Sequence, residues 1–167
     1  MSFDPESMLK GRMAESLVEE LLKQCGNKVY RFGYEAVLQN LTQLEERFDR
    51  ESEVGQRISS IPDFIVVNQK KISIVEVKFR TDLAGLSRYE KDIEKLKLIE
   101  EFWQAKIIWV TLAKPYFKIS IPPYFNRRGD LNLIPIEKDS DLGVNSDVLK
   151  EFNELVEKYY QKEKSKK

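Results

Sequence analysis

Histidine is absent from this sequence of 167 residues, and cysteine occurs once, as Cys25. Without an imidazole, the chain cannot build a Ser-His or Cys-His catalytic pair or a zinc site with His ligands. A single cysteine excludes an internal disulfide and a zinc site made of cysteines. Phosphodiester chemistry in this chain would therefore have to use carboxylates, lysine and a metal that prefers oxygen ligands.

Long apolar runs and an excess of one charge are also absent. No run is long enough to span a membrane and no signal peptide is visible, so we expect a cytoplasmic protein without membrane contact. The 28 Lys and Arg residues balance the 28 Asp and Glu residues, so no global basic field indicates a nucleic-acid binder. A local basic patch can still bind nucleic acid at this net charge.

What is present indicates one globular domain. The hydrophobic fraction is 41%, and the chain has 9 Phe, 7 Tyr and 2 Trp residues, which is enough for a core of its own. We expect residues 1–167 to form a single domain of the α/β class. Its core would span about 4–112, followed by an extension at 113–161 and a basic tail at 162–167.

The stretch 62–78 is the most informative part of the sequence. Polar residues at 68–71 separate two apolar runs rich in β-branched residues, which predicts two strands joined by a short turn. If the two middle residues form the turn, Asp63 lies opposite Glu76, and alternation places both on one face with Lys78. We expect both faces to be covered, because both are largely apolar. The further pairs would be Ile65 with Ile74 and Val67 with Ile72, and the second face would hold Phe64, Val66, Ser73, Val75, Val77 and Phe79.

Two carboxylates and a lysine at one end of a covered hairpin need an explanation. Asp63 and Glu76 repel each other, and burial raises the cost of ionising both. A hard divalent cation such as Mg²⁺ removes this conflict, and Lys78 can hold or help to deprotonate a metal-associated water. The three side chains suit metal-assisted hydrolysis of a phosphodiester. The alternative is a half-exposed hairpin end with a Glu76–Lys78 salt bridge and no chemistry.

Two short motifs in this stretch carry a family resemblance. Pro62-Asp63 resembles the PD element of the PD-(D/E)xK nuclease superfamily, and Glu76-Val77-Lys78 resembles its (D/E)xK element. The resemblance implies a restriction-endonuclease-like fold, with an αβββαβ core and a mixed central sheet flanked by helices. It also implies that Asp63, Glu76 and the Val77 carbonyl hold Mg²⁺, for which Mn²⁺ can substitute. Lys78 would orient the attacking water and offset the charge that develops on the phosphate.

Residues 4–25 are predicted to form the first helix. Asp4 can cap it, Pro5 suits its first turn, and Gly26 follows its end. Apolar residues at helical spacing form a stripe that we expect to face the sheet. The stripe consists of Leu9, Met13, Leu17, Leu21 and Cys25, and is widened by Val18 and Leu22.

The same helix contributes a further acidic candidate. The run from Lys10 to Glu15 is similar to the first-helix element of Holliday-junction-resolvase-like members of the superfamily, in which a glutamate reaches the metal site. Glu15 is the position that matches that glutamate. From the residues alone, Glu19 or Glu20 would serve as well.

The remaining elements follow the order of the superfamily core. The Gln-x-x-x-Tyr element of the RecB-like branch is missing from the second core helix, which argues against that branch. The charged face of this helix is expected to be solvated surface; it carries Lys91, Asp92, Glu94, Lys95, Lys97 and Glu100. We expect a first strand at 29–34, an inserted helix at 35–52, a polar loop at 53–60, a helix at 88–103 capped by Ser87, and a strand at 106–112.

The C-terminal third is expected to complete the domain. Residues 113–135 mix aromatics, prolines and basic residues, and are predicted to form an irregular wall on the core. An edge strand at 131–136 and an extra C-terminal helix at 146–161 would follow. Candidates for contact with a nucleic-acid backbone are Arg57, Ser59 and Ser60 in the loop before the PD strand, and Arg127 and Arg128 in the wall.

The leading hypothesis is a Mg²⁺-dependent PD-(D/E)xK endonuclease that hydrolyses DNA. The resemblance in the first helix favours duplex or branched DNA, cleaved by a homodimer. The alternative is a non-catalytic member of the same fold that acts as a nucleic-acid-binding or assembly module. A third possibility is an unrelated α/β protein, in which Asp63, Glu76 and Lys78 would point apart.

Overall fold

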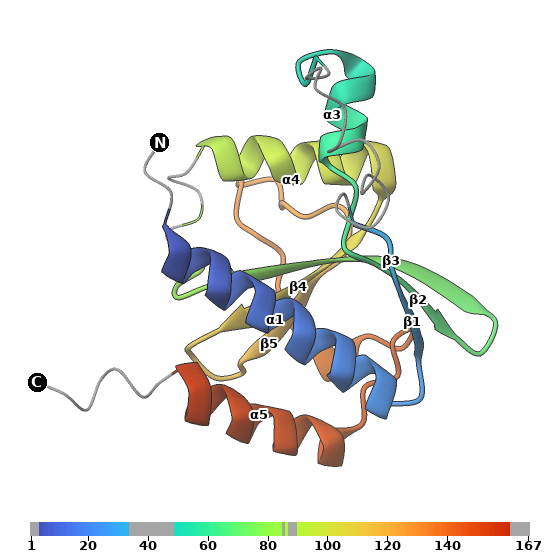
Figure 1. Ribbon diagram of the computed structural model, residues 1–167, viewed down its shortest axis with the longest axis vertical. Coiled ribbons are helices and arrows are strands. Elements are labelled where there is room, and N and C mark those ends of the chain that lie inside the picture. The colour runs from blue at the N-terminus through green and yellow to red at the C-terminus, as the bar shows by residue number, and fades with distance from the viewer. Residues whose placement is uncertain (1–3, 34–48, 85, 87–89, 161–167) are drawn as a thin grey trace, which may run out of the picture.

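The computed structural model describes residues 4–33, 49–84, 86 and 90–160 (Figure 1). In this part of the chain, six strands form one sheet in the order β1-β2-β3-β4-β5-β6. Neighbouring strands are antiparallel except β3 and β4, which are parallel. The strands are β1 (Lys28–Arg31), β2 (Phe64–Asn68), β3 (Lys71–Arg80), β4 (Lys106–Thr111), β5 (Phe117–Ser120) and β6 (Ile134–Pro135).

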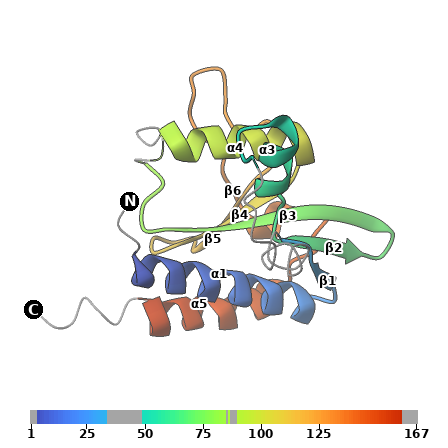
Figure 2. The same cartoon turned by 45° about the horizontal axis from the view of Figure 1, so that its top comes forward.

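Helices cover both faces of this sheet, as Figure 2 shows. α1 (Pro5–Gln24) and α5 (Ser146–Tyr160) lie side by side on one face. α4 (Glu90–Trp103) lies on the other face and contacts the short α3 (Glu53–Ser59). A 3-10 turn, η2 (Ile136–Lys138), precedes α5. The order α1, β1, β2, β3, α4, β4 confirms the predicted αβββαβ core with its mixed sheet.

The β2–β3 hairpin has the predicted register. Ile65 pairs with Ile74 and Val67 with Ile72, and the two-residue turn begins at Gln69. The prediction that both faces are covered is wrong near the turn, where Ile72 is 71% exposed. The hairpin tip extends past the helices there (Figure 1). The buried residues of the second face are Phe64, Val66, Ser73, Val75 and Val77.

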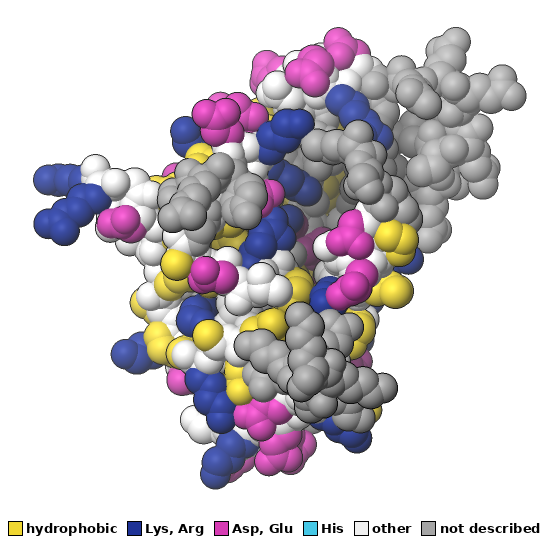
Figure 3. All heavy atoms as spheres, turned by 90° about the vertical axis from the view of Figure 1, so that its left-hand side faces the viewer, with side chains coloured by type: hydrophobic (Ala, Val, Ile, Leu, Met, Phe, Trp, Pro, Cys, Tyr) yellow, Lys and Arg dark blue, Asp and Glu magenta, His cyan; other side chains and the backbone are white. Residues whose placement is uncertain are grey.

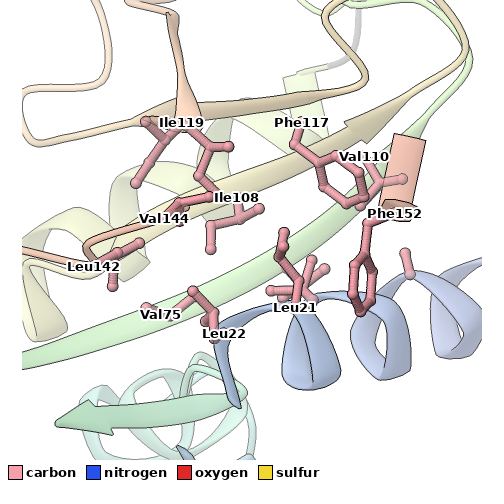
Figure 4. Packing of buried hydrophobic residues seen from close by; sticks show 14 of the residues in the cluster. Leu21, Leu22, Val75, Ile108, Val110, Phe117, Ile119, Leu142, Val144 and Phe152 are labelled. Atoms are coloured by element: carbon pink, nitrogen blue, oxygen red, sulfur yellow. The ribbon is translucent and has the colours of Figure 1, made fainter. Parts of the chain in front are cut away.

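α1 begins as predicted, and the C-terminal part of its predicted apolar stripe faces the core. The Asp4 side chain accepts the backbone N–H of Glu6 at 3.1 Å. Leu9 is 56% and Met13 38% exposed, so the predicted stripe is wrong at its N-terminal end. Because α1 contacts α5 as well as β3, its buried side faces both elements. That side consists of Ala14, Val18, Leu21 and Leu22, and Figure 4 shows Leu21 and Leu22 with Val75, Ile108 and Phe152.

A second core joins α4 to the opposite face of the sheet. Leu96 and Ile99 of α4 pack with Ile107 and Trp109 of β4. The buried Trp109 ring donates its indole N–H to the Ser120 hydroxyl at 3.0 Å, which satisfies its polar end. The two cores therefore hold α1 and α4 on opposite sides of β3.

The C-terminal third contains more sheet than expected. The predicted irregular wall at 113–135 is wrong in part, because β5 pairs with β4 and β6 pairs with β5. The strand expected at 131–136 is limited to β6, and an isolated bridge joins Phe125 to Leu131. The helix expected at 146–161 is confirmed as α5. Among the described helices, none combines the length and the apolar character needed to cross a membrane.

The segment before β2 also differs from its prediction. The polar loop expected at 53–60 is wrong, because α3 occupies most of it. Ser52 is the reason, since its side chain caps the helix by accepting a backbone N–H at 3.1 Å. Most of the helix predicted at 35–52 lies outside the described residues, and 49–52 are not helical. The predicted cap Ser87 also lies outside the described residues.

Candidate active site

β3 extends beyond its neighbour β2. The ladder stops where β2 begins, whereas β3 continues to Arg80 beside β4. The same register places Pro62 opposite Val77, and a proline has no N–H to donate. The N–H of Val77 is taken instead by Oδ2 of Asp63, at 2.7 Å. The Pro-Asp dipeptide thus ends the ladder, and no strand of the described residues pairs with the last part of this β3 edge.

Asp63 is fixed at this point by its own backbone. Its carbonyl accepts the N–H groups of Phe32, at 2.8 Å, and Gly33, at 3.1 Å. In a strand, the N–H and C=O of one residue face the same neighbour, so the Val77 carbonyl lies on the side of Asp63. The carboxylate and this carbonyl therefore face a common space at the open edge of β3.

The second carboxylate lies on the same face of the hairpin, where the register places it opposite Asp63. Glu76 is 4% exposed, so its charge is largely removed from water. Burial, the charge of Glu76 and the charge of Glu15 raise the pKa of Asp63 to about 8, against the opposing effects of the Val77 N–H and Lys78. The pair carries more negative charge than its surroundings can stabilise.

Lys78 is bound to this pair. Its ammonium forms a short salt bridge and hydrogen bond with Oε1 of Glu76. Burial alone would lower the pKa of Lys78, but the charge of Glu76 outweighs this effect and raises it. Lys78 is therefore held as a cation beside the two carboxylates. The three side chains do not point apart, as they would in the third of the sequence hypotheses.

A groove of about 510 Å³ follows the open edge of β3, between α1 and α4. Glu15 lines it from α1, Val77 to Thr81 form its floor, and Lys95 lines it from α4. Figure 3 faces this side of the molecule, and Lys and Arg side chains gather near the middle of the view. The groove therefore brings Glu15, from the helix on one face of the sheet, and Lys95, from the helix on the other face, to the same edge of β3.

Of the three glutamates considered in α1, Glu15 is the one that lines the groove. Its charge contributes to the raised pKa of Asp63, so it lies within electrostatic range of that carboxylate. Glu19 is engaged elsewhere, at 2.6 Å from Arg31 and 2.7 Å from Lys23. The packing of α1 thus separates candidates that the sequence left equal.

The donor set fits a hard divalent cation. Among the described residues there is no cluster of three or more His, Cys, Asp or Glu side chains arranged as a metal site. Mg²⁺ does not require one, because it is commonly bound by one or two carboxylates and keeps several waters. Asp63, Glu76 and the Val77 carbonyl offer three oxygen donors, and the raised pKa of Asp63 reflects negative charge that a cation would compensate.

The residues proposed to contact a nucleic-acid backbone lie away from the groove lining. Ser60 is 2% exposed and accepts the indole N–H of Trp103, so the prediction that it faces a substrate is wrong for this structure. Arg57 stacks over the ring of Phe102 at 5.0 Å, on the α3–α4 contact. Exposed positions are held by Ser59 at the end of α3, and by Arg127 and Arg128 in the loop after Phe125.

Lys95 is the groove residue that the sequence argument missed. The sequence predicts a solvated helix face here, and Lys95 is exposed, but it also lies close enough to Lys78 for that charge to lower its pKa. A signal was present in the helical spacing. Lys95 immediately precedes the buried Leu96 and lies one turn before the buried Ile99, at the border of the apolar face.

The αβββαβ order and the mixed sheet are those expected of a restriction-endonuclease-like fold. The family model described as TnsA-like endonuclease N terminal matches residues 30–111, just under half of the chain. The matched segment runs from β1 to the end of β4 and contains the two PD-(D/E)xK elements, whereas Glu15 lies before it. The match to an endonuclease family agrees with the resemblance seen in the sequence, because both rest on the segment that contains Asp63, Glu76 and Lys78.

One solved structure with a related arrangement is that of Hjc, a Holliday junction resolvase from the archaeal hyperthermophile Archaeoglobus fulgidus. The similarity has a TM-score of 0.40 and 16% sequence identity, and covers 84% of this chain and 98% of that chain. No curated protein matches the sequence.

Proposed function

We propose that this protein is a metal-dependent endonuclease that hydrolyses phosphodiester bonds in DNA. One observation carries the proposal: Asp63, Glu76, the Val77 carbonyl and Lys78 converge on an open strand edge, beside a groove that Glu15 also lines. An open groove suits a polymeric substrate better than an enclosed pocket does. The match to an endonuclease family supports the reaction class.

The chain's own residues have distinct roles in this proposal. Asp63, Glu76 and the Val77 carbonyl would hold Mg²⁺ or Mn²⁺, and such an ion lowers the pKa of water and offsets phosphate charge. Lys78, kept protonated by Glu76, would orient the attacking water and donate to the phosphate as negative charge develops there. Glu15 would accept a hydrogen bond from a water on the α1 side.

The substrate in this proposal is duplex or branched DNA. Cleavage of two strands at one place would need two such grooves, which a homodimer would supply. The resolvase Hjc acts on Holliday junctions, so a four-way junction belongs among the substrates to be tried. The groove at the β3 edge would contact only a few nucleotides of either substrate.

A non-catalytic nucleic-acid-binding module is the second candidate. The observation in its favour is the ion pair between Lys78 and Glu76, which already compensates one of the two carboxylates. In that case Lys78 and Glu76 would form a buried salt bridge that serves the fold alone. The two candidates predict different results when metal and DNA are supplied together.

The test is incubation of the protein with supercoiled plasmid, linear duplex and a four-way junction, each with Mg²⁺, Mn²⁺ or EDTA. We expect metal-dependent cleavage that falls by at least about 100-fold in Asp63→Asn and in Lys78→Ala, the size of effect typical of lost transition-state stabilisation. Lys70→Ala, an exposed turn residue, is the control and should cleave like the wild type. DNA binding without cleavage by the wild type would favour the binding module.

A further inference from the structure

Among the described residues, three cationic side chains line the groove, and two of them are paired. Lys78 binds Glu76, and Arg80 lies 3.0 Å from the carboxylate of Asp92. For Lys95, no carboxylate of the described part of the chain comes within salt-bridge distance. Of the groove cations that the structure describes, Lys95 is therefore the one whose charge is left for an incoming anion.

Lys95 also lies close to Lys78 and to the two carboxylates. Its ammonium is influenced first by Lys78 and then by burial, Glu76 and Asp63, so all three core side chains lie within its electrostatic range. Lys95 approaches from α4, whereas Glu15 approaches from α1. Two neighbouring ammonium groups repel each other, and an anion placed between them would relieve this repulsion.

We infer that Lys95 is a further catalytic residue, which donates a hydrogen bond to a non-bridging oxygen of the scissile phosphate. This inference rests on the proposed nuclease function and assigns the phosphate a place between α4 and the β3 edge. Lys78 and the two carboxylates would then face the attacking water on one side of the phosphorus. Lys95 would neutralise the phosphate from the other side, as preorganised donors do at developing charge.

Lys97 provides a matched control for this assignment. It has the same side chain, lies in the same helix and is exposed like Lys95, but it is not among the groove-lining residues. The variants are Lys95→Met, which keeps the length and removes the charge, Lys95→Arg, which keeps the charge, and Lys97→Met. Thermal unfolding of each variant establishes that it is folded.

The first measurement is binding of a fluorescent duplex oligonucleotide in EDTA over a range of salt concentrations. Loss of one phosphate contact reduces the slope of log affinity against log salt by about 1. We expect this reduction for Lys95→Met and an unchanged slope for Lys95→Arg and Lys97→Met. Equal slopes for Lys95→Met and Lys97→Met would overturn the inference.

The second measurement is the single-turnover cleavage rate with Mg²⁺ and saturating DNA. We expect a loss of about 100-fold for Lys95→Met, partial recovery in Lys95→Arg and a rate within about twofold of wild type for Lys97→Met. If the wild type cuts DNA and Lys95→Met is fully active, Lys95 is not a catalytic residue, and the proposed nuclease function stands. If the wild type binds DNA and does not cut it, the proposed nuclease function is overturned. The salt dependence of binding would then still decide whether Lys95 contacts phosphate. A wild type that neither binds nor cuts DNA would overturn both.

Discussion

Asp63 takes part in two interactions that affect its carboxylate in opposite ways. Its carboxylate accepts the Val77 N–H, which closes the end of the β2–β3 ladder, and it also lies opposite Glu76. Burial and the charge of Glu76 disfavour the ionised form of Asp63, whereas the hydrogen bond from the Val77 N–H favours it. The balance favours a proton on Asp63 when no cation is bound, so this residue should make the metal-free protein sensitive to pH.

The pKa of Asp63 rises from 3.8 to about 8 on folding without metal. Between these values the folded state binds a proton that the unfolded state releases, so this contribution to stability is present below pH 4 and is lost as the pH rises through 8. Asp63→Asn has no carboxylate to ionise, so it does not lose this stability as the pH rises, and its amide oxygen can still accept the N–H of Val77. We expect the free energy of unfolding of Asp63→Asn to gain on the order of 2 kcal/mol over wild type between pH 5 and pH 9, less than the whole shift because Asp63 is partly exposed.

Urea unfolding of both proteins in EDTA at pH 5, 7 and 9 measures this difference. A difference that stays constant over the range would show that the Asp63 carboxylate ionises normally in the folded protein. Asp130→Asn, in an exposed loop, is the control and should show no such trend.

At the scale of elements, the rotation of α1 about its axis decides which glutamate meets the site. Ala14 and Val18 are fully buried, which turns the adjacent Glu15 toward the groove. Glu20 lies on another side of the helix and is exposed, 3.6 Å from Lys23. The rotation depends on two partners, because α1 packs on β3 and on α5 together.

Glu15→Gln should therefore reduce cleavage by about 10- to 100-fold, as expected for a residue that acts beside the metal ligands. Glu20→Gln should cleave within about twofold of wild type, because its side chain lies outside the groove. Cleavage rates under single-turnover conditions, with thermal unfolding to compare stability, check this prediction. The reverse order of effects would mean that α1 presents a different face to the active site.

At the scale of the whole molecule, the groove exists because two cores hold helices on opposite faces of one sheet. α1 is anchored by one core and α4 by the other, and β3 projects between them. Far from the groove, the Lys106 ammonium binds Asp139 at 2.7 Å and Asp141 at 2.8 Å, which joins the start of β4 to the segment before α5. The acidic end of β3 is thus held between two packed layers, and a cation bound there should stabilise the folded state.

Mn²⁺ or Mg²⁺ should raise the unfolding temperature of the wild-type protein. A ligand at 100 times its dissociation constant stabilises the folded state by about 2.7 kcal/mol. Because metal binding requires an ionised Asp63, the gain should increase from pH 6 to pH 8 and level off above. Thermal unfolding with and without metal measures it; Asp63→Asn should lose the gain and Glu20→Gln should keep it. An equal gain in Asp63→Asn would place the cation at another site.

Much of the hairpin could be predicted from the sequence, because its constraints are local. The alternation of apolar residues and a two-residue turn fix the pairing of Ile65 with Ile74, and this pairing brings Asp63 opposite Glu76. The α1 cap at Asp4 and the position of α5 were predictable for the same reason, since capping and helical periodicity act within a few residues. β5 was missed because four residues between prolines are too few to show a period.

The sequence by itself determined which mechanisms are excluded and that Asp63 lies opposite Glu76, because an absent residue type excludes a mechanism and strand alternation operates over neighbouring positions. Only the tertiary structure decided that Glu15 rather than Glu19 lines the groove, that Ser60 is buried, and that Lys95 lies beside Lys78. These outcomes depend on the orientation of α1 and α4 about their own axes and on how the two helices pack on the sheet. That orientation is set by packing between residues far apart in the chain, which no local pattern encodes.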